Sequence, residues 1–316
     1  MAKVSVVVVT YNALPWADQC FGSLMASDYP VDVVVVDNAS SDNTVDYIRS
    51  RFPDVFLVEA GRNLGFGLAN NLGMKLAVQR GAQYLFLLNQ DAWVQPSTVG
   101  QLLLGFAFLP DTAVLSPLHL DGGGKDVDLY LQRYLREAGH SIGPQPPLSS
   151  PRYLDVPFVN AAAWFLPAEL LNKVGGFDPI FFHYGEDRHF ASRVLHVGGN
   201  IRVDTQSFVY HDRLERILKT GMNPPPTLDR EWVHFLTQAC HPSLSTYRWF
   251  SLKRVLRHSL LAIQWTIQGS ISKAKIHAGL AHRILRHQGR IRTARQRGQT
   301  AALCLPSPVP PGLQIG

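Results

Sequence analysis

The sequence has only three cysteines, and they stand far apart at Cys20, Cys240 and Cys304. An odd number of widely spaced cysteines forms no zinc-binding pattern and disfavours a disulfide framework, which favours a reducing compartment. No window of 18 uninterrupted apolar residues exists, so no membrane-spanning helix is predicted. The apolar run Val4–Val9 is too short for a signal peptide and lacks its small-residue exit, and we therefore predict a cytoplasmic protein.

Acidic residues are missing from the last quarter of the chain. Glu231 is the last of them, and residues 232–316 carry 12 Lys and Arg, six His and no Asp or Glu. Residues 1–231 hold the other 18 basic residues and all 24 acidic ones, so an acidic body of net charge −6 precedes a basic tail. The formal charge of +6 therefore belongs to the tail, where it bears on partners rather than on fold.

Residues 1–110 alternate between two hydrophobic periods, and hydrophobic residues make up 46% of the chain, enough for a globular core. Unbroken β-branched runs are typical of strands buried on both faces. The predicted strands are Val4–Val9, Val31–Asp37, Val55–Glu59 and Gln83–Asn89, and the predicted helices lie at about 14–27, 40–52, 67–80 and 97–108. Short connections imply right-handed βαβ units, so we predict an α/β fold with a mainly parallel sheet flanked by helices.

The pattern weakens in residues 110–155, which contain Gly122–Gly124, several prolines and little periodicity. We predict an irregular insertion there, with Leu129–Glu137 as a candidate short helix. Beyond it the predicted elements are a helix at 185–196 and short strands at Ile201–Val203 and Phe208–Tyr210. From about residue 230 the tail has helical spacing, interrupted near Pro242 and Gly269, and its last dozen residues are Pro-rich and predicted to be disordered.

Polar segments follow the first strands, and ligands of parallel sheets bind beyond the carboxyl ends of the strands. In VVDNASSDNT (Val35–Thr44) an acid at the strand tip can accept hydrogen bonds from a ribose or a base, and a capped turn is the alternative. Gly65 in NLGFG permits close approach of a ligand, but a simple strand-to-helix loop explains it equally well. The fingerprint G-x-G-x-x-G does not follow the first strand, which counts against a dehydrogenase.

Carboxylates and one histidine follow the later strands. Asp91 in NQDAW could hold a divalent cation that bridges two phosphates, with a helix-entry turn as the alternative. His211 alone is more typical of a structural histidine, but imidazole together with the Asp91 carboxylate suits Mn²⁺ or a similar ion. Glu186 and Asp187 begin a predicted helix, where the helix dipole by itself favours acids; a general base beside a sugar site is the functional interpretation.

The order and spacing of these segments are more specific than any one of them. VSVVVVTYN, VVDNASSDNT, NLGFGLANN, LLNQDAW, NAAAWFLP, GGFDPIFFHYGED and VYH follow one another between Val4 and His211. Together they resemble the family 2 glycosyltransferases, inverting enzymes with the A-type nucleotide-sugar fold, and most of all the rhamnosyltransferase-like enzymes of bacterial surface polysaccharide assembly. The resemblance implies transfer of a sugar from a nucleotide-diphosphate sugar to a saccharide or lipid-linked acceptor.

The resemblance also implies a role for each matching residue. The substrate pocket would be formed by Thr10, Asn12, Asp37, Asn38, Asn63, Gly65, Asn70, Asn89 and Trp164. Asp91 stands where the family's metal-binding acid motif ends, with Asn89 in the place of its first acid, and His211 would complete the coordination of Mg²⁺ or Mn²⁺. Asp187 would be the catalytic base, with Glu186 supporting it.

Two departures from the family pattern bear on function. Arg188 and His189 follow the Glu-Asp pair, where the family often has another acid, and this concerns the acceptor contacts more than the base. The Q-x-x-R-W signature of processive members is missing, since Ser245 stands where Gln would precede Arg248 and Trp249. We therefore expect transfer of a single sugar rather than polymerisation.

These observations predict a catalytic domain over 1–229, with a nucleotide-sugar half at about 1–110 and an acceptor half at about 111–229, then a basic helical extension over 230–300 and a disordered tail over 301–316. Residues 248–297 could adhere to an anionic membrane surface on the inner face of the cell membrane, or the extension could pack on the catalytic domain. Nucleic acid binding ranks lower, because no recognised module accompanies the basic run. A non-catalytic scaffold that binds sugar nucleotides is another rival. A nucleotidyltransferase on a similar sheet is a further alternative, but it leaves the segment from GGFD to the Glu-Asp pair unexplained.

Overall fold

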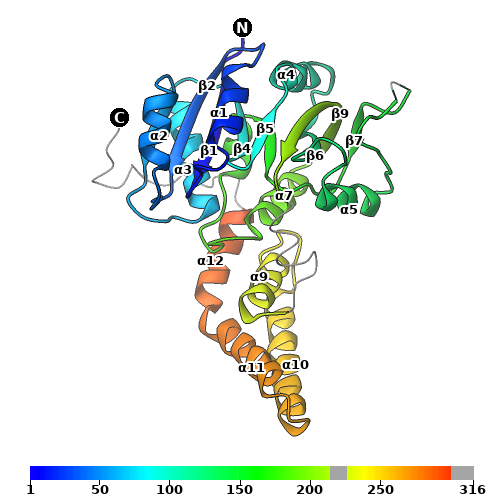
Figure 1. Cartoon of the computed structure of the whole chain (residues 1–316). Helices are drawn as coiled ribbons and strands as arrows, with labels where there is room; N and C mark the ends of the chain where they lie inside the picture. The colour runs from blue at the N-terminus through cyan, green and yellow to red at the C-terminus, as the bar shows by residue number, and fades with distance from the viewer. Residues whose placement is uncertain (148, 214–225, 300–316) are drawn as a thin grey trace.

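The computed structural model describes residues 1–147, 149–213 and 226–299. These residues form a domain built around one large β-sheet, and an elongated group of helices that projects from one end of that domain (Figure 1). The tail predicted over 301–316 lies outside the described residues.

The first half of the sheet domain has the predicted alternation. Its elements are β1 (Val4–Thr10), α1 (Ala17–Met25), β2 (Val31–Asp37), α2 (Thr44–Arg51), β3 (Phe56–Glu59), α3 (Phe66–Gln79) and β4 (Tyr84–Asn89). β1 pairs in parallel with both β2 and β4, and β2 pairs in parallel with β3. The strands and helices predicted for this half are confirmed, with ends shifted by a few residues.

The second half completes a nine-stranded sheet of order β3-β2-β1-β4-β8-β6-β9-β5, with β7 paired to β9. Its elements are β5 (Ala92–Val94), α4 (Thr98–Phe108), β6 (Thr112–Asp121), α5 (Leu129–Glu137), β7 (Tyr153–Asp155), β8 (Ala163–Pro167), α6 (Leu170–Val174), α7 (Glu186–His196) and β9 (Asn200–His211). β8 is antiparallel to β4, so the sheet is parallel on one side and mixed on the other. The two short strands predicted after residue 200 are parts of the single strand β9.

The structure differs from the sequence prediction in residues 110–155. The ten-residue strand β6 is buried and pairs with β9 along most of its length. Pro117 lies inside β6, and the pairing register shifts between Pro117 and Leu118. A proline inside an apolar run argues against a strand because it removes a ladder donor, and this is why the sequence predicts irregular structure here. The short helix predicted at Leu129–Glu137 is present as α5.

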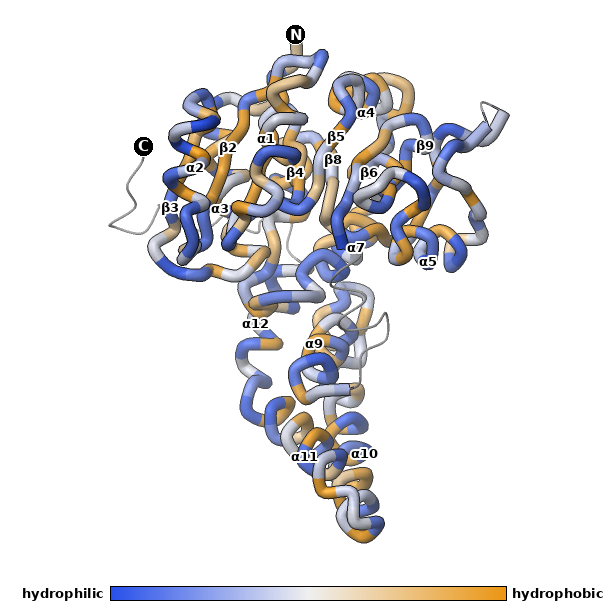
Figure 2. The backbone as a smooth tube through the Cα atoms, viewed as in Figure 1, coloured by the Kyte–Doolittle hydropathy of each residue, from blue (hydrophilic) through white to orange (hydrophobic). Residues whose placement is uncertain are grey.

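The core lies on both faces of the sheet, as unbroken apolar strands require. Val7, Val34 and Val36 belong to one hydrophobic cluster, whereas Val6 and Val8 belong to the other. Successive residues of one strand therefore pack against opposite layers of helices. In Figure 2 the central strands are accordingly coloured as hydrophobic. Burial on both faces leaves the ends of the strands as the places where polar side chains can gather.

The helical extension consists of α9 (Leu228–Ala239), α10 (Tyr247–Ile267), α11 (Ile271–Arg286) and α12 (Gln288–Gln299). α10 and α11 lie side by side as a hairpin, and the chain turns between them at Gly269, whose φ is +74°. α12 then runs back to the sheet domain (Figure 1). The predicted interruptions near Pro242 and Gly269 are present. Among the described helices, none is both long enough and apolar enough to cross a membrane.

Candidate active site at the carboxyl ends of the strands

The tips of β1 and β2 are joined through a buried carboxylate. Thr10 lies opposite Asp37 in the parallel register, and its hydroxyl donates to Asp37 Oδ1 at 2.9 Å. The Ser40 backbone amide donates to Asp37 Oδ2, also at 2.9 Å. Asp37 is 2% exposed and Thr10 is fully buried, so these two expected pocket residues shape the strand ends from beneath.

Asn12 forms a second connection between the two strand ends. Its φ of +53° lies in the left-handed region, which asparagine tolerates better than most residues. Asn12 Oδ1 accepts from the Ser41 amide at 2.8 Å and from the Asp42 amide at 3.3 Å. The side chain therefore fixes the turn that precedes α2, and it is only partly buried, so it remains within reach of solvent.

Asn38 and Asn63 hold the loop before α3. Asn38 Nδ2 donates to Asn63 Oδ1 at 3.0 Å, and Asn38 Oδ1 accepts from the Leu64 amide at 2.7 Å. Asn63 Oδ1 also accepts from the Gly65 amide at 2.8 Å. Asn63 is exposed and Asn38 is buried, so the structure brings these two expected pocket residues together, with one side chain at the surface.

Gly65 is required for contact with another part of this chain. Its φ is +78°, and a Cβ at this position would lie 2.1 Å from the Phe182 carbonyl oxygen. The close approach that the sequence suggested for a ligand is therefore made by the Phe182 backbone. This contact joins the loop before α3 to the segment that leads into α7.

Asn70 and its neighbour Asn71 have different roles. Asn70 is 2% exposed and donates to the Phe66 carbonyl within its own helix. Asn71, which the sequence analysis missed, forms two hydrogen bonds with the backbone of Phe177, at 2.7 and 2.8 Å. Asn71 thus ties α3 to the segment Gly175–Asp178, which we call the GGFD segment. Two adjacent asparagines in NNLG gave no sign of which one would make the long-range contact.

Trp164 and Asn89 lie on the paired strands β8 and β4. The Trp164 side chain is fully buried, packs beside the rings of Phe177 and Phe190, and donates from Nε1 to the Val159 carbonyl. It belongs to the core beneath the site and has no exposed surface for a ligand. Asn89 ends β4, is partly buried, and its amide donates to the Ala162 carbonyl at 2.9 Å.

The expected metal ligands Asp91 and His211 are in contact, although they are 120 residues apart in sequence. Antiparallel pairing of β5 with β9 sets Ala92 opposite His211, and this register brings Asp91 beside the imidazole. Asp91 Oδ1 lies 3.2 Å from His211 Nε2, and both side chains are buried. Burial, followed by the nearby Arg213 charge, lowers the pKa of His211, so its ring is neutral at pH 7, as a metal ligand must be.

Three further residues surround this pair and were missed by the sequence analysis. Arg213 Nε donates to His211 Nε2 at 3.1 Å and lies 3.9 Å from Asp128 Oδ2. Asp128 caps α5 by accepting from two backbone amides. His119 is fully buried beside His211, with 6.2 Å between ring centroids. An acid directly before the candidate helix Leu129–Glu137 was the one signal for Asp128, whereas Arg213 and His119 had none.

A carboxylate and a neutral imidazole in contact suit Mn²⁺ better than Mg²⁺, which prefers oxygen ligands. Within residues 1–147, 149–213 and 226–299, no group of three or more His, Cys, Asp or Glu side chains is arranged to hold a metal. Asp91 and His211 could therefore supply two ligands, and oxygens of a bound substrate would have to supply others. A cation on His211 Nε2 also requires the hydrogen bond from Arg213 to break. With these conditions the residues fit the ion.

Asp187 and Glu186 occupy the first turn of α7, directly after Gly185 in the left-handed conformation. Asp187 is half-buried, and its Oδ1 accepts from the Arg188 amide at 2.7 Å. Burial raises the pKa of Asp187, while amides of Arg188 and Ala161 partly oppose this. Burial and the adjacent Asp187 charge raise the pKa of Glu186 well above its usual range, which favours the protonated form. Arg213 acts on the charge of Asp187, so the acid pair and the Asp91–His211 pair belong to one neighbourhood.

The two residues that depart from the family pattern have separate structural roles. The Arg188 guanidinium lies over the Phe158 ring at 4.1 Å and beside the Tyr134 ring at 5.6 Å. His189 is buried against Phe181, with ring centroids 5.2 Å apart. Arg188 is exposed and stands next to Asp187, so it is available to an acceptor, whereas His189 is part of the packing.

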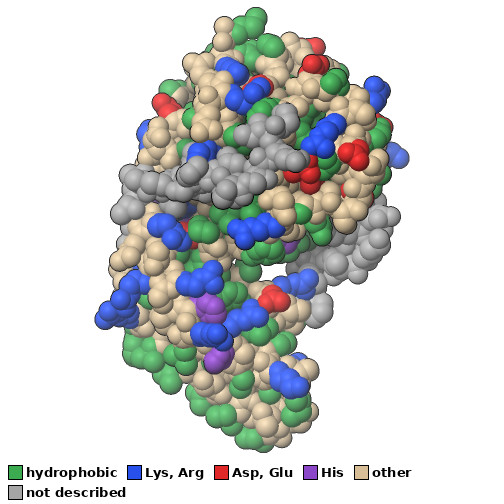
Figure 3. All heavy atoms as spheres, turned by 90° about the vertical axis from the view of Figure 1, so that its left-hand side faces the viewer, with side chains coloured by type: hydrophobic (Ala, Val, Ile, Leu, Met, Phe, Trp, Pro, Cys, Tyr) green, Lys and Arg blue, Asp and Glu red, His purple; other side chains and the backbone are tan. Residues whose placement is uncertain are grey.

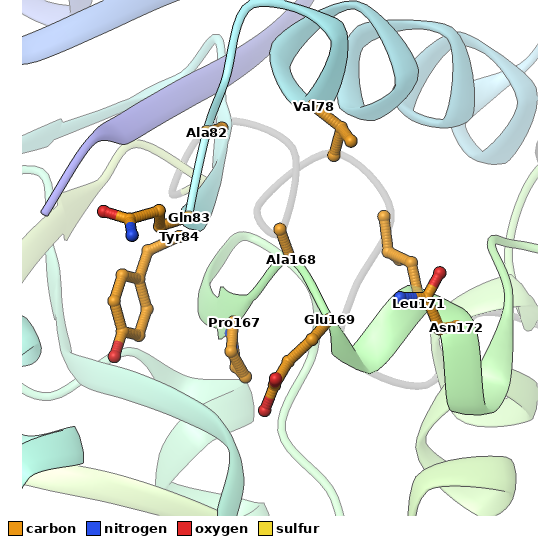
Figure 4. A pocket seen from close by; sticks show the side chains of 9 residues that line it. All are labelled: Val78, Ala82, Gln83, Tyr84, Pro167, Ala168, Glu169, Leu171 and Asn172. Carbon is orange, nitrogen blue, oxygen red and sulfur yellow. The ribbon is translucent and has the colours of Figure 1, made fainter.

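A hollow of about 500 Å³ lies elsewhere on the sheet domain (Figure 4). Its lining includes Gln83, Tyr84 and Pro167, at the starting end of β4 and the finishing end of its antiparallel neighbour β8. None of the expected site residues lines it. The candidate site is therefore distinct from this hollow.

Comparison with known proteins agrees with the fold and with the order of the segments. Residues 5–175 match the family described as Glycosyl transferase family 2, and the chain belongs to that family. It is 27% identical over 295 residues to an N-acetylglucosaminyl-diphospho-decaprenol L-rhamnosyltransferase of Mycobacterium tuberculosis, with 84% of this chain and 90% of the relative covered. The rhamnosyltransferase-like resemblance is thereby confirmed.

Solved structures of TarS from S. aureus have a similar fold. TarS 1–349 in complex with UDP-GlcNAc superposes with a TM-score of 0.53 at 18% identity, covering 99% of this chain and 96% of that one. A longer TarS structure gives the same TM-score over 93% of this chain, which spans 55% of the TarS chain. At this identity the likeness supports the fold, an α/β sheet domain of the glycosyltransferase A type followed by helices.

Proposed function

We propose that this chain transfers a single sugar from a nucleotide-diphosphate sugar to a lipid-linked glycan acceptor, with inversion at the anomeric carbon. The observation that carries the proposal is the meeting of three distant segments at one end of the sheet. Asp91 follows β4, His211 ends β9, and Asp187 lies in the first turn of α7, with Arg213 acting on both His211 and Asp187. A candidate cation-binding pair beside a carboxylate of raised basicity is what such a transfer needs.

In this proposal the nucleotide lies over the ends of β1 and β2. Asn12 and Asn63 reach the surface there, while Thr10 and Asp37 hold the strand ends in register. Asp91 and His211 would hold a divalent cation, which neutralises charge on the leaving diphosphate when it is bound. Arg213, once released from His211, can donate to the same phosphate oxygens.

Asp187 is the proposed catalytic base. Its carboxylate takes the proton of the acceptor hydroxyl, the hydroxyl oxygen forms a bond to the anomeric carbon, and the bond from that carbon to the diphosphate oxygen breaks with its electron pair. Attack from the face opposite the diphosphate inverts the configuration, and no covalent glycosyl-enzyme is needed. Glu186, whose raised pKa keeps it protonated, packs against α3 near Gly67 and supports the first turn of α7.

Donor and acceptor are proposed from the relatives. The Mycobacterium tuberculosis relative is named for transfer of L-rhamnose to a lipid-linked N-acetylglucosaminyl diphosphate, and a Micrococcus luteus relative, 30% identical over 104 residues, is an undecaprenyl-phosphate mannosyltransferase. We therefore propose a polyprenyl-linked acceptor, with dTDP-rhamnose as the first donor to test. We also propose that residues 248–297 of the basic extension meet an anionic membrane surface, on the cytoplasmic side where nucleotide sugars are made.

The experiment is a panel of dTDP-, UDP- and GDP-sugars, tested with Mg²⁺ and with Mn²⁺. Thermal shift of the full chain identifies the donor that binds, and incubation with a short-chain polyprenyl-diphosphate N-acetylglucosamine identifies the acceptor. NMR of the product reports the anomeric configuration. A product with retained configuration, or stabilisation by no nucleotide sugar, would contradict the proposal.

A further inference from the structure

Sugar transfer leaves one surface of the extension unexplained, a row of apolar side chains along the outer side of α10. We call this row the α10 stripe; its members are Trp249, Leu252, Leu256, Leu260, Ile263 and Ile267. They recur every three or four residues, so they lie on one face of the helix. Each is between 47% and 81% exposed, and together they extend for about 27 Å at 1.5 Å per residue.

The stripe points away from the rest of the protein. The residues of α10 that are buried, Tyr247, Ser251 and His258, lie on the opposite side of the helix. His258 meets His277 of α11 there, with 3.0 Å between their Nδ1 atoms. α10 therefore has a complete partner on its inner face, and the stripe is a second apolar face. Figure 3 shows hydrophobic side chains exposed over the lower lobe, which the extension forms.

Cations border the stripe on both sides. Lys253 and Arg257 follow one edge and Arg248 lies at the other, and all three are exposed. The Lys253 ammonium lies 5.0 Å from the centre of the Trp249 ring. No Asp or Glu occurs anywhere in residues 232–316. An amphipathic helix with aromatic and aliphatic residues on one face, and with cations but no acids beside them, is typical of a helix that lies in the interface of an anionic bilayer.

The same charges argue against a second copy of this chain as the occupant. Apolar spacing of three and four residues also suits helix pairing, which uses opposite charges at the flanking positions. Two α10 stripes brought together in parallel would set Lys253 and Arg257 against the same cations, and an antiparallel pair would give them no acidic partner, because α10 has no Asp or Glu. Such like-charge contacts are unfavourable, whereas anionic headgroups complement the same residues.

We propose that the α10 stripe enters the headgroup region of an anionic membrane, with α10 lying parallel to the membrane plane. This rests on the membrane contact proposed above for residues 248–297 and narrows it to one helix face. α12 is excluded from the contact, because Ile291 and Ala294 are buried and Arg295 donates to backbone carbonyls of the α9–α10 connection. The cations of α12 that look free in the sequence are thus partly engaged within the protein.

The α10 stripe belongs to the extension that leaves the sheet domain beside the candidate site. The extension projects from the end of the domain where α7 begins (Figure 1). α9 packs directly beneath that point, since a Cβ on Gly185 would lie 2.8 Å from Val233 and 2.9 Å from Thr237. A membrane held along α10 would therefore pass close to the end of the sheet domain that carries Asp187.

The test is sedimentation of the full chain with vesicles. Vesicles of phosphatidylcholine with phosphatidylglycerol are compared with phosphatidylcholine alone, at low and high salt. The stripe variant L256E/L260E is expected to bind the anionic vesicles at least tenfold more weakly than wild type. The control L104E/F108E introduces the same two acids at exposed apolar positions of α4, four residues apart, and is expected to bind like wild type.

Unchanged vesicle binding by the stripe variant would overturn the proposal. Failure of the wild-type chain to bind anionic vesicles would also overturn it. Concentration-dependent dimers that L256E/L260E abolishes, without vesicle binding, would show that a second copy covers the stripe. Thermal shift by the donor nucleotide sugar is measured on all three proteins. Donor stabilisation retained without vesicle binding contradicts only the membrane contact, and vesicle binding without donor stabilisation contradicts only the proposed function.

Discussion

An ion pair with a buried carboxylate ties α12 to the sheet domain. Arg297 of α12 donates from Nε and Nη2 to the two carboxylate oxygens of Asp178, at 3.0 and 2.8 Å. Asp178 has no exposed side-chain surface and lies in the GGFD segment, where its Oδ1 also accepts from the Ile180 amide. On the other side of this segment, Arg193 of α7 donates to the Gly176 carbonyl at 2.6 Å. Replacing Arg297 should therefore disturb the support of the candidate catalytic helix.

We expect R297A to lower the free energy of unfolding by about 3 kcal/mol at pH 7. Removing one partner of a buried pair costs about 3–5 kcal/mol, because the remaining charge is left uncompensated. The lower end applies here because the Arg297 side chain is 35% exposed. R283A is the matched control: Arg283 pairs with Asp229 at 2.6 Å, but Asp229 is 83% exposed. Exposed pairs contribute less than about 1 kcal/mol.

The pH dependence of the stability difference between R297A and wild type gives a second test. Burial raises the pKa of Asp178, but hydrogen bonds from Arg297 and the Ile180 amide outweigh it, and the pKa lies below its ordinary value of 3.8. A carboxyl group whose pKa is lowered in the folded protein stabilises the fold at pH values above the pKa of the unfolded chain. This stabilisation is lost as the pH falls through the pKa of the folded state. The difference in unfolding free energy between R297A and wild type should thus have its full size at pH 7 and become smaller below about pH 4.

Urea unfolding followed by circular dichroism measures these differences. The double variant D178N/R297M should recover part of the loss, because it leaves no unpaired buried charge. If R297A and R283A unfolded alike at pH 7, the ion pair would not be what holds α12 against the GGFD segment.

Four further outcomes are expected. G65A should lower the free energy of unfolding in urea by roughly 3 kcal/mol or more, because its Cβ would meet the Phe182 carbonyl. G61A has a similar φ of +68° but open space around it, and it should cost about 1 kcal/mol. Equal costs for the two variants would contradict the contact between Gly65 and Phe182. E186Q should retain transfer within about tenfold, since glutamine resembles the protonated acid, and a larger loss of kcat would show that the carboxylate is needed. D91N should lose the additional thermal shift that Mn²⁺ gives to nucleoside diphosphate binding, while D54N keeps it. The rate of transfer should fall on acidification with a midpoint above pH 3.8, because the pKa of Asp187 is raised and the base must be deprotonated; a lower midpoint would exclude that base.

The parallel half of the fold could be predicted from the sequence because its signals are local. Val4–Val9 and Val31–Asp37 are β-branched runs separated by helical spacing, and each run became a strand. β6 could not be predicted in the same way, since Pro117 interrupts its run and its pairing with β9 depends on residues about 90 positions away. Long-range pairing has no local periodicity to reveal it.

Site residues that occur in the family's ordered motifs could be predicted from the sequence. Site residues that reach the site only through tertiary packing could not. Asp91 and His211 were expected together, but the contact itself depends on the β5–β9 register, which no local pattern encodes. Trp164 matched the family order, yet it lies in the core. The role of Arg213 follows only from its hydrogen bond to His211 in the structure. The contact of α12 with Asp178 likewise follows only from the three-dimensional fold. Contacts of this kind arise from tertiary geometry, and the sequence carries no separate sign of them.

The central claim, that Asp187 is the base of a sugar transfer, is tested most directly by measuring donor binding and transfer on the same D187N protein. The account predicts that transfer falls by about 10²–10⁴-fold, the usual contribution of a general base, while the thermal shift by the donor is unchanged. D54N, which alters an exposed acid in the loop before β3, should leave both measurements as in wild type. Transfer by D187N within tenfold of wild type would contradict the account.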